Sequence, residues 1–406
     1  MIHLLTALAV QNGRTIKQAD CKFAFIQATL PPEEITVVKP PVGCPFSNSH
    51  QYWRLKKSLY GLHHAPLHWY NVLHSILESP ELGLKCCPHD PCIFHGSLIP
   101  GKPPLYVAIY MDDIIFFSLD DDVEQYFCSA LSQKRKVEFL GDAECYIGIK
   151  FDWNRSSYGS LSYRSSQEGF AAAIVEEMGL LMANKSPLMT PFHSGFPIDT
   201  NPHVDMSPED RAPLISKMEC WMGILNWLQQ CTCPDLATIF SLLASHMHCP
   251  RPGHHEAAKY IGHYILSTLD LGLVFSNKAT SSFESYIYFP LPDTCENDPN
   301  PLLTTFCDAN WGPQDASHPS PSNTHSVSIH ESKSICGQIF FFVGCPILWK
   351  THKEAKISHS SCEVEIKATD ECVKNVQMVC NILSDLLLCP TGPIPINNDN
   401  CADATV

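Results

Sequence analysis

Two short apolar runs separated by a polar break are the strongest signal along this chain. The runs LYVAI and IIFF enclose four residues, which are Tyr110, Met111, Asp112 and Asp113. Apolar runs of this length on both sides of a tight break are typical of a buried hairpin. Two adjacent carboxylates cannot both be buried unpaired, because desolvation is costly or shifts the pKa until the group is neutral. The pattern therefore predicts a hairpin at 105–118 with an exposed acidic turn, and such oxygens are typical ligands of divalent cations.

The rest of the N-terminal half alternates between strand-like and helix-like patterns. The segment TIKQAD at 15–20 alternates like a strand that ends at Asp20, and FAFIQATL predicts the start of a helix. The same periodicities predict helices at 1–10, 65–77 and 121–134, and strands at 92–96, 145–153 and 160–165. This β-α-β-β-α-β order is typical of a ferredoxin-like split arrangement, in which helices back an antiparallel sheet.

In such a sheet the end of the first strand can lie beside the hairpin turn. Asp20 would then be next to Asp112 and Asp113. Three carboxylates at one sheet edge suit two divalent ions about 3.5–4 Å apart, which activate an attacking oxygen and stabilise a leaving one in phosphoryl transfer. Without the hairpin, Asp20 would be better explained as a strand-end or helix-cap residue.

The C-terminal half contains helical patterns followed by strands. Helices are predicted at 211–230, 234–246 and 253–268, a proline-rich linker at 289–301, strands at 303–309 and 337–344, and a helix at 361–388. Ser360 and Glu363 have capping-box spacing at the start of that last helix. Glu365 lies about 200° around the helix from Glu363, so only one can face a given site. If Glu363 caps the helix, Glu365 is left to face a site shared with Asp308 and Asp399.

Composition limits the class of protein. The chain has 406 residues, 20 cysteines and a formal net charge of −15. This charge argues against coating of nucleic acid by charge alone, so binding would need local basic patches. No apolar segment is long enough to span a bilayer, and MIHLLTALAV lacks the basic region and cleavage site of a signal peptide. The cysteines lie mostly in apolar contexts, which indicates reduced core residues of an intracellular protein.

Several strings share the order and spacing of one family. They are QADCKFAF at 18–25, LKKSLYGLHHAPLHWY at 55–70, HDPCIF at 89–94, YMDDIIF at 110–116 and YIGIKF at 146–151. These strings resemble the reverse transcriptase of copia-type retrotransposons. The resemblance continues into the RNase H domain that follows in that family, through TCPDLA at 232–237, CDANW at 307–311, WKTHKEAKISHSSCEVE at 349–365 and NNDN at 397–400.

The resemblance implies a role for each matching residue. The matching acids are Asp20, Asp112 and Asp113 for the polymerase, and Asp308, Glu365 (or Glu363 in its place) and Asp399 for RNase H. Phe25 matches the aromatic residue that floors the sugar pocket, where a flat ring leaves no room for a ribose 2′-hydroxyl. The other substrate-binding positions implied are Tyr60, Gly61, Tyr110 and Met111, and 146–149 resembles the turn that grips the primer end.

The fold class implied is α+β. It comprises a palm and thumb polymerase fold, with a ferredoxin-like antiparallel sheet and incomplete fingers, followed by an α/β RNase H-like domain. The predicted domains are a palm with incomplete fingers at 1–175, a helical thumb or connection at 176–288, a linker at 289–301 and a C-terminally truncated RNase H-like domain at 302–406. Because fingers strands are expected upstream and a fourth RNase H acid downstream, a polyprotein fragment or decayed copy is expected.

The function implied is RNA-directed DNA synthesis with associated RNase H activity, by two-metal chemistry with Mg²⁺ or Mn²⁺. The implied partners are an RNA template, a DNA primer, an RNA–DNA hybrid and deoxynucleoside triphosphates, with no membrane. An intracellular location is expected, in a cytoplasmic virus-like particle with room for a nuclear stage. Two alternatives stay open, a catalytically dead relic and a recruited nucleic-acid-binding module. Retention of all six acids argues against the pure binding module, whereas the missing segments favour weak or absent activity.

Overall fold

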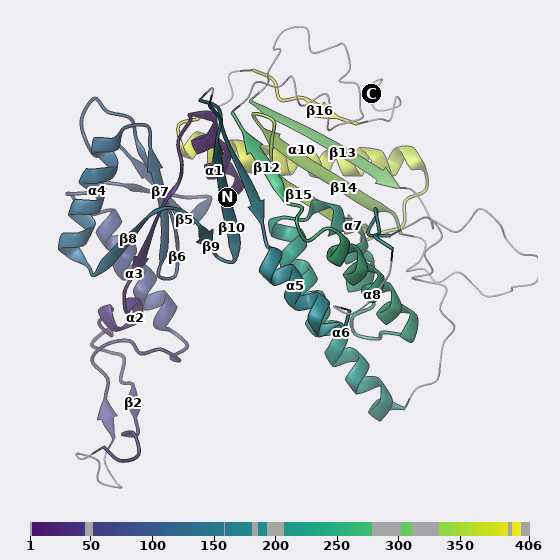
Figure 1. The fold of residues 1–406 in the computed structure, drawn as a ribbon, viewed down its shortest axis with the longest axis horizontal. Coiled ribbons are helices and arrows are strands. Elements are labelled where there is room, and N and C mark those ends of the chain that lie inside the picture. The colour runs from purple at the N-terminus through teal and green to yellow at the C-terminus, as the bar shows by residue number, and fades with distance from the viewer. Residues whose placement is uncertain are drawn as a thin grey trace, which may run out of the picture.

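A six-stranded antiparallel sheet forms the centre of the N-terminal half (Figure 1). Its strands, in spatial order, are β4 (Lys85–Cys87), β5 (Asp90–Gly96), β6 (Leu105–Tyr110), β7 (Asp113–Ser118), β1 (Lys17–Cys21) and β8 (Val137–Asp142). This computed structural model describes residues 2–44, 52–157, 159–180, 186–192, 207–277, 302–310, 333–388 and 392–398. Neighbouring strands of the sheet are all antiparallel, which confirms the mixed helix and antiparallel-sheet class.

The predicted hairpin is present as β6 and β7, and both of its faces are buried. On β7, Ile114 and Phe116 pack against helices, whereas Ile115 and Phe117 pack into a second core on the opposite face. Successive residues of a strand point to opposite faces, so a strand covered on both sides needs a continuous apolar run. This explains why LYVAI and IIFF show no polar alternation.

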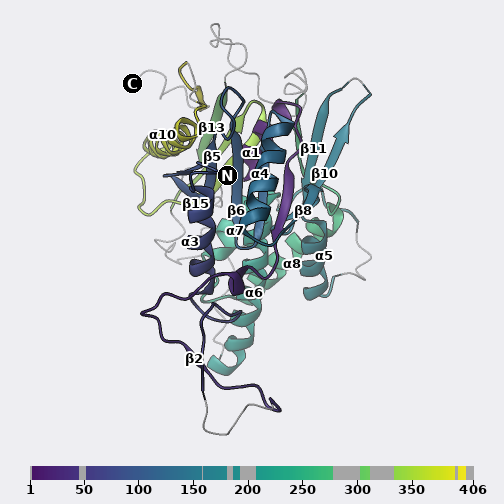
Figure 2. The same ribbon diagram turned by 90° about the vertical axis from the view of Figure 1, so that its left-hand side faces the viewer.

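Helices α3 (Ala65–Leu77) and α4 (Asp121–Lys134) cover one face of this sheet (Figures 1 and 2). The bounds of both helices agree with the predicted ranges. α4 begins after Asp120, whose carboxylate accepts a hydrogen bond from the Asp122 backbone N–H at 2.8 Å. Such an N-cap satisfies one of the backbone donors that the first helical turn leaves unpaired.

The strand that completes the split arrangement is β8, which the sequence does not predict. β8 pairs with β1, and the strands at 145–153 and 160–165, expected in this sheet, lie in another one. The second sheet has the order β12 (Leu273–Ser276), β11 (Leu161–Ser166), β10 (Ile149–Arg155) and β9 (Cys145–Tyr146). β8 is an edge strand with mostly exposed residues, VEFLGD, and therefore carries little apolar signal.

Between β1 and α3 the chain is largely irregular. The helix predicted to start in FAFIQATL is a single turn, α2 (Ala24–Gln27), which follows Phe23 in a left-handed conformation with φ 56°. β2 (Val37–Val38) and β3 (Trp53–Arg54) pair as a narrow ribbon. This ribbon projects away from the six-stranded sheet (Figures 1 and 2).

A group of helices packs beside the second sheet. It consists of α5 (Glu168–Glu177), α6 (Pro208–Cys231), the 3-10 turn η1 (Pro234–Leu236), α7 (Ala237–Ala244) and α8 (Pro252–Ser267). These helices share one apolar core that contains Trp221 and Ile261. The helices predicted at 211–230, 234–246 and 253–268 are therefore present, whereas α5 is not predicted. No helix in the described part of the chain is long and apolar enough to cross a membrane.

The C-terminal part contains a third sheet with one long helix on its face (Figure 1). Its strands, in spatial order, are β15 (Cys345–Lys353), β14 (Ile335–Phe342), β13 (Leu303–Asn310) and β16 (Ile396–Asn397), and α10 (Ser361–Asp385) crosses it. β16 is parallel to β13, and the other pairs are antiparallel. The predicted strands at 303–309 and 337–344 and the helix at 361–388 are present; β15 is not predicted. The linker predicted at 289–301 lies outside the described residues.

Helix α1 (Ile2–Gln11) joins the N- and C-terminal parts through a shared core. Every residue from His3 to Val10 is buried, as expected of a helix that is apolar all round. The Gln11 side-chain amide donates hydrogen bonds to the carbonyl oxygens of Ser276 at 2.9 Å and Val343 at 3.1 Å. The first helix therefore holds the second and third sheets together, and the predicted domain bounds stay predictions.

Candidate active site

The strand register brings the three predicted polymerase acids together. Asp20 on β1 is directly opposite Asp113 on β7, and Asp113 is in turn opposite Tyr110 across the hairpin. Met111 and Asp112 form the two-residue turn, in which Met111 has a left-handed φ of 55°. Opposite residues of an antiparallel pair lie on the same face of a sheet, about 4.5–5.5 Å apart. Asp20 and Asp113 therefore project side by side, with Asp112 at the adjoining turn.

The position of the acidic turn is fixed by two hydrogen bonds to its backbone. The Cys21 N–H of β1 donates to the Asp112 carbonyl at 2.8 Å. The indole Nε1–H of Trp69, on α3, donates to the Met111 carbonyl at 2.7 Å, and Trp69 is fully buried. A buried helix and the neighbouring strand thus both support the turn, while Met111 itself is half exposed.

The electrostatics of the acids favour a bound cation. Burial raises the pKa of Asp113, and the nearby charges of Asp112 and Asp20 raise it further, while a hydrogen bond from Gln18 lowers it. Burial and the same acids raise the pKa of the Cys21 thiol to about 12. Like charges that oppose ionisation of one another mark a site where a cation would be stabilising. The residues present therefore fit a divalent metal.

One of the three acids, Asp20, is paired with a lysine. The Lys22 ammonium lies 2.8 Å from Asp20 Oδ2 and 2.7 Å from Glu138 Oε2 on β8. Lys22 is exposed, so a divalent cation can displace it from Asp20 at small cost. Lys22 is not among the predicted site residues, although its place two residues after Asp20 could have pointed to it.

An aromatic pair lies beside the acids. The rings of Phe25 on α2 and Tyr60 have centroids 4.8 Å apart and are tilted by 50°. Burial raises the pKa of the Tyr60 phenol, followed by the charges of Asp112 and Asp20, which places this ring close to both carboxylates. Gly61 follows with a φ of 92° in open space, a conformation that side chains disfavour. Of the predicted substrate-binding residues, Tyr110 and Met111 thus adjoin the acids within the hairpin, and Phe25 contacts Tyr60.

The segment 146–149, predicted to resemble a primer-gripping turn, forms the tight turn between β9 and β10. Ile147 and Gly148 both have positive φ, 47° and 79°, the combination that two-residue hairpin turns favour. Tyr146 is buried, and the charge of Asp113 contributes to raising its pKa, after burial. A side chain built on Gly148 would meet Trp227 of α6 at 3.8 Å. This turn therefore lies between the acidic site and α6.

The predicted C-terminal acids are arranged differently. Glu365 is buried on α10 and accepts a hydrogen bond from the Asn398 side-chain amide at 3.3 Å. Cys307 and Ala309 on β13 pack toward α10. Asp308 lies between those two residues in the strand, so alternation places its exposed side chain on the opposite face.

The described residues therefore do not bring Asp308 to Glu365. Asp399 lies outside the described residues, so its predicted place beside Glu365 stays a prediction. The cap at the start of α10 is present, because Ser360 Oγ accepts from the Glu363 N–H at 3.1 Å. The Glu363 carboxylate accepts from the His359 N–H at 2.7 Å and pairs with Lys367. Glu363 is occupied at the helix start, as expected for the residue that caps it.

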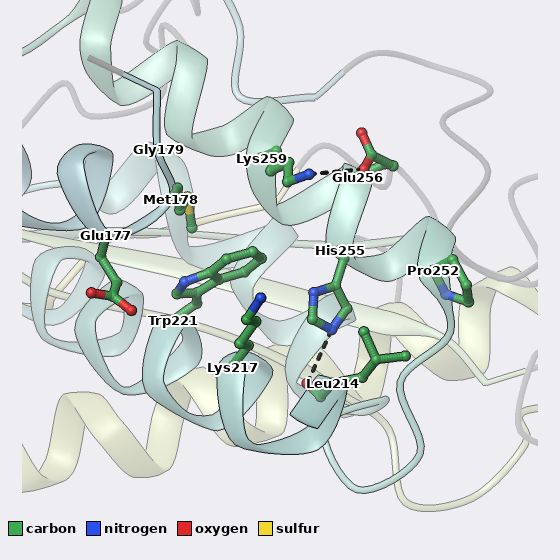
Figure 3. A pocket seen from close by; sticks show the side chains of 10 residues that line it. All are labelled: Glu177, Met178, Gly179, Leu214, Lys217, Trp221, Pro252, His255, Glu256 and Lys259. Carbon is green, nitrogen blue, oxygen red and sulfur yellow. Dashed lines mark hydrogen bonds and ion pairs between the residues drawn. The ribbon is translucent and has the colours of Figure 1, made fainter. Parts of the chain in front are cut away.

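A separate cavity of about 440 Å³ lies among α5, α6 and α8 (Figure 3). It is lined by basic, acidic and apolar side chains, and the indole of Trp221 lies in its wall. The Trp221 Nε1–H is buried and has no hydrogen-bond partner among the described residues. None of the predicted site residues lines this cavity, so it is distinct from the acidic site.

Residues 1–194 match the model of the family described as reverse transcriptase (RNA-dependent DNA polymerase). The chain is 25% identical over 98% of its length to the Retrovirus-related Pol polyprotein from transposon RE2 of Arabidopsis thaliana, covering 24% of that protein. It is 24% identical over 95% of its length to the Retrovirus-related Pol polyprotein from transposon TNT 1-94 of Nicotiana tabacum, covering 26% of it. A putative transposon Ty5-1 protein of Saccharomyces cerevisiae is 23% identical over 88% of the chain and is covered completely.

The chain thus spans about a quarter of the length of the first two of these curated relatives. The family match ends at residue 194, before α6, whereas the similarity to the polyproteins continues through the C-terminal sheet. The matched segment contains β1, the acidic hairpin and the aromatic pair described above. The chain carries a reverse transcriptase domain of the kind found in the Pol polyproteins of copia-type retrotransposons.

Proposed function

We propose that this chain extends a DNA primer on an RNA template with deoxynucleoside triphosphates. The observation that carries the proposal is the cross-strand pair of Asp20 and Asp113 beside Asp112, at the turn of a buried hairpin. Phosphoryl transfer needs little covalent chemistry from the protein. It needs positioning and stabilisation of negative charge, and an acid cluster that fits divalent cations serves both.

Asp20, Asp112 and Asp113 would hold two Mg²⁺ or Mn²⁺ ions. The ions would supply charge stabilisation at the attacking and leaving oxygens. The protein's own part is to hold the three carboxylates in one place through the β1–β7 register and the support from Trp69. Lys22, now paired with Asp20, is placed to release that acid and contact substrate phosphate.

Selection of the sugar is proposed for the aromatic pair. Phe25 is partly buried and packs on the core beneath α3, with Tyr60 against its ring. A rigid ring at the floor of the pocket leaves no space for a 2′-hydroxyl, so deoxynucleotides would be preferred. The closeness of Tyr60 to Asp20 and Asp112 supports this placement.

We also propose a second activity for the C-terminal sheet, hydrolysis of the RNA strand of an RNA–DNA hybrid. The strand order β15-β14-β13-β16, with a parallel pair and a helix across one face, offers a scaffold for the predicted RNase H acids. Asn398 contacts Glu365 and immediately precedes Asp399 in sequence, which supports a shared site for those two. Asp308, on the opposite face of β13, lies apart from that pair.

The polymerase proposal is tested by primer extension with the full chain on a primed RNA template, with Mg²⁺ and then Mn²⁺. Asp112→Asn should abolish incorporation, because it removes charge at nearly constant volume. The matched control is Asp122→Asn, an exposed aspartate on α4. Equal activity of the Asp112→Asn variant would contradict the proposed site. No incorporation by the folded wild-type chain would favour the catalytically dead alternative.

A further inference from the structure

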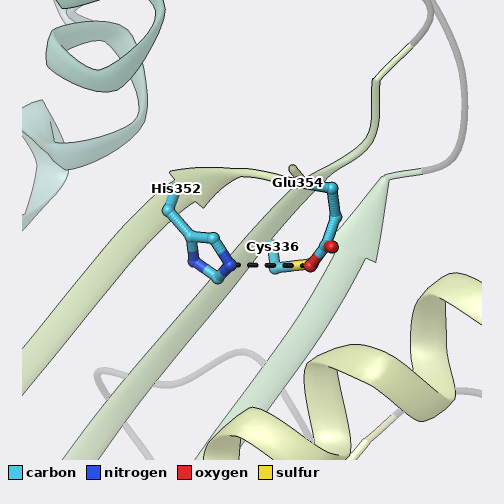
Figure 4. A group of neighbouring side chains, drawn as sticks. All are labelled: Cys336, His352 and Glu354. Atoms are coloured by element: carbon cyan, nitrogen blue, oxygen red, sulfur yellow. Dashed lines mark hydrogen bonds and ion pairs between the residues drawn. The ribbon is translucent and has the colours of Figure 1, made fainter. Parts of the chain in front are cut away.

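Three potential metal ligands of different chemistry meet on the C-terminal sheet. Cys336 on β14 lies directly opposite His352 on β15, and Glu354 follows at the end of β15. One ligand atom of each lies within 4.8 Å of the other two. Figure 4 shows the three side chains pointing toward one another above the sheet. Neither of the activities proposed above uses these residues.

Two of the separations between the ligand atoms match a tetrahedral zinc centre. Cys336 Sγ lies 3.3 Å from Glu354 Oε1, and the same oxygen lies 3.5 Å from His352 Nε2. Zinc bonds of about 2.3 Å to sulfur and about 2.0–2.2 Å to nitrogen or oxygen, at tetrahedral angles, separate the ligand atoms by roughly 3.4 to 3.6 Å. The Glu354 oxygen is therefore already at ligand spacing from both the thiol and the imidazole.

The backbone holds the ligands in place. Cys336 and His352 are paired across the β14–β15 ladder. The Glu354 N–H donates to the Ser334 carbonyl at 2.8 Å, which continues that ladder past the strand end. Cys336 is only 3% exposed, so the thiol is held inside the fold. Preorganised ligands on adjacent strands lower the ordering cost of binding an ion.

A surplus of negative charge surrounds the thiol. The Cys336 thiol donates a hydrogen bond to the Glu354 carboxylate at 3.3 Å. Glu371, on α10, lies 2.7 Å from His352 Nε2, and its other oxygen pairs with Lys350 at 2.6 Å. Several carboxylates around one imidazole and one thiol leave the group short of positive charge, which a divalent cation would supply.

We propose that Cys336, His352 and Glu354 bind one Zn²⁺ ion, with Glu371 placed to take the fourth position. Sulfur and imidazole ligands select Zn²⁺ over Mg²⁺, which prefers oxygen ligands alone. The thiol proton leaves to solvent when the ion binds, and the imidazole binds as its neutral form. The ion would tie β14 and β15 to α10 and stabilise the C-terminal sheet against unfolding.

The test uses Co²⁺, which replaces Zn²⁺ and is visible by absorption, with the full chain kept reduced by a phosphine. The wild-type chain should show a thiolate-to-cobalt charge-transfer band that one equivalent saturates, that Zn²⁺ removes and that excess Mg²⁺ leaves. Cys336→Ser should lose the band. The matched control is Cys345→Ser, a buried cysteine at the other end of the β14–β15 pair, which should keep it.

Two variants that retain the thiol keep the test decisive if Cys336→Ser does not fold. His352→Asn and Glu354→Gln should each weaken Zn²⁺ binding at least tenfold, measured by competition with a chelator, and should lose the rise in melting temperature that Zn²⁺ gives the wild type. An absent band in folded wild-type chain, a band that persists in Cys336→Ser, or unchanged affinity in both thiol-retaining variants would each overturn the proposal. The proposed polymerase acids lie on the six-stranded sheet. Failure of the zinc proposal would therefore leave the polymerase proposal standing, and the reverse also holds.

Discussion

The two sets of predicted catalytic acids differ in how their carboxylates are assembled. In the six-stranded sheet, one ladder register sets Asp20 opposite Asp113, and the hairpin turn supplies Asp112. In the C-terminal sheet, Glu365 projects from a helix, and Asp308 lies on the other face of β13. A one-residue slip in register moves a side chain to the opposite face of a sheet. A site built on one strand pair is therefore specified by the register of that pair, whereas a site assembled from strand, helix and loop depends on the packing of the whole domain.

The largest expected effect is on the first site. Asp113→Asn should lower primer extension about 10³-fold or more, because loss of one charged group at a phosphoryl-transfer site removes several kcal/mol of stabilisation. The rate of incorporation at saturating substrate measures it. If Glu138→Gln, a variant of the acid that pairs with Lys22 on β8, lowered the rate as much, the three-acid site would be wrong.

The same substitution should stabilise the metal-free fold. The folded-state pKa of Asp113 is raised by burial and by Asp112, so its favourable contribution to stability is present at low pH and is lost as pH rises through that pKa. Asp113→Asn removes the destabilisation that ionisation of Asp113 causes. The melting temperature of this variant should therefore exceed that of the wild type at neutral pH in the presence of chelator.

Asp142 provides the opposite case for this measurement. Its pKa is lowered, because hydrogen bonds from Lys17 and Thr15 outweigh the effect of burial. Its contribution is therefore present at neutral pH and is lost as pH falls, so Asp142→Asn should lower the melting temperature. If the melting temperatures of both variants shifted equally in the same direction, the assigned electrostatic difference between Asp113 and Asp142 would be wrong.

The support of the hairpin turn gives the next largest effect. Trp69→Phe removes the indole donor to the Met111 carbonyl and leaves space in the core beneath α3. We expect a loss of about 1–3 kcal/mol in the free energy of unfolding, measured with denaturant. Trp153→Phe is the control, because Trp153, on β10 of the second sheet, donates a comparable hydrogen bond to the Ala143 carbonyl. Only the Trp69 variant should also reduce metal affinity at the acidic site.

A smaller change is expected in sugar selection. Phe25→Val should lower discrimination against ribonucleotides by about tenfold, since opening space for one small group in a pocket is worth roughly 1–3 kcal/mol. The ratio of kcat/KM for a deoxynucleotide and its ribonucleotide counterpart measures it. Ile26→Val, a change at an exposed residue of the same helical turn, should leave the ratio unaltered; an unaltered ratio in Phe25→Val itself would assign that ring to packing alone.

The smallest effect is expected at the C-terminal acids. Glu365→Gln should weaken Mg²⁺ binding to the C-terminal sheet by a few-fold, whereas Glu363→Gln should leave Mg²⁺ binding unchanged and slightly lower the melting temperature through loss of its contacts at the start of α10. Calorimetric titration and thermal unfolding separate the two outcomes. If only the Glu363 variant bound Mg²⁺ more weakly, Glu363 would be the metal ligand in place of Glu365.

Local sequence patterns predict the helices best, because the apolar periodicity and the residues typical of helix starts indicate the same bounds. α3 and α4 have the predicted bounds, with Pro66 in the first turn of α3 and Asp120 capping α4. β15 is not among the predicted strands, and Pro346 within it is a residue that disfavours a strand; in the structure Pro346 pairs with Phe341, next to a register shift between Phe340 and Phe341.

Side-chain contacts between distant elements could not be read from such patterns. The bond from Trp69 to the Met111 carbonyl joins a helix to a turn 42 residues away, and Lys22 pairs with an acid on the unpredicted strand β8. The pairing of Asp20 with the hairpin was predictable, since the order of strands and helices limits the possible sheets.

The central claim is that Asp20, distant in sequence, shares divalent cations with the hairpin acids. Mn²⁺ binding to the full chain, followed by electron paramagnetic resonance, tests it most directly and needs no catalytic turnover. Asp20→Asn should weaken Mn²⁺ affinity at least tenfold, and Lys22→Met should strengthen it by freeing Asp20. Unchanged affinity in Asp20→Asn, with the control Asp142→Asn also unchanged, would contradict the account.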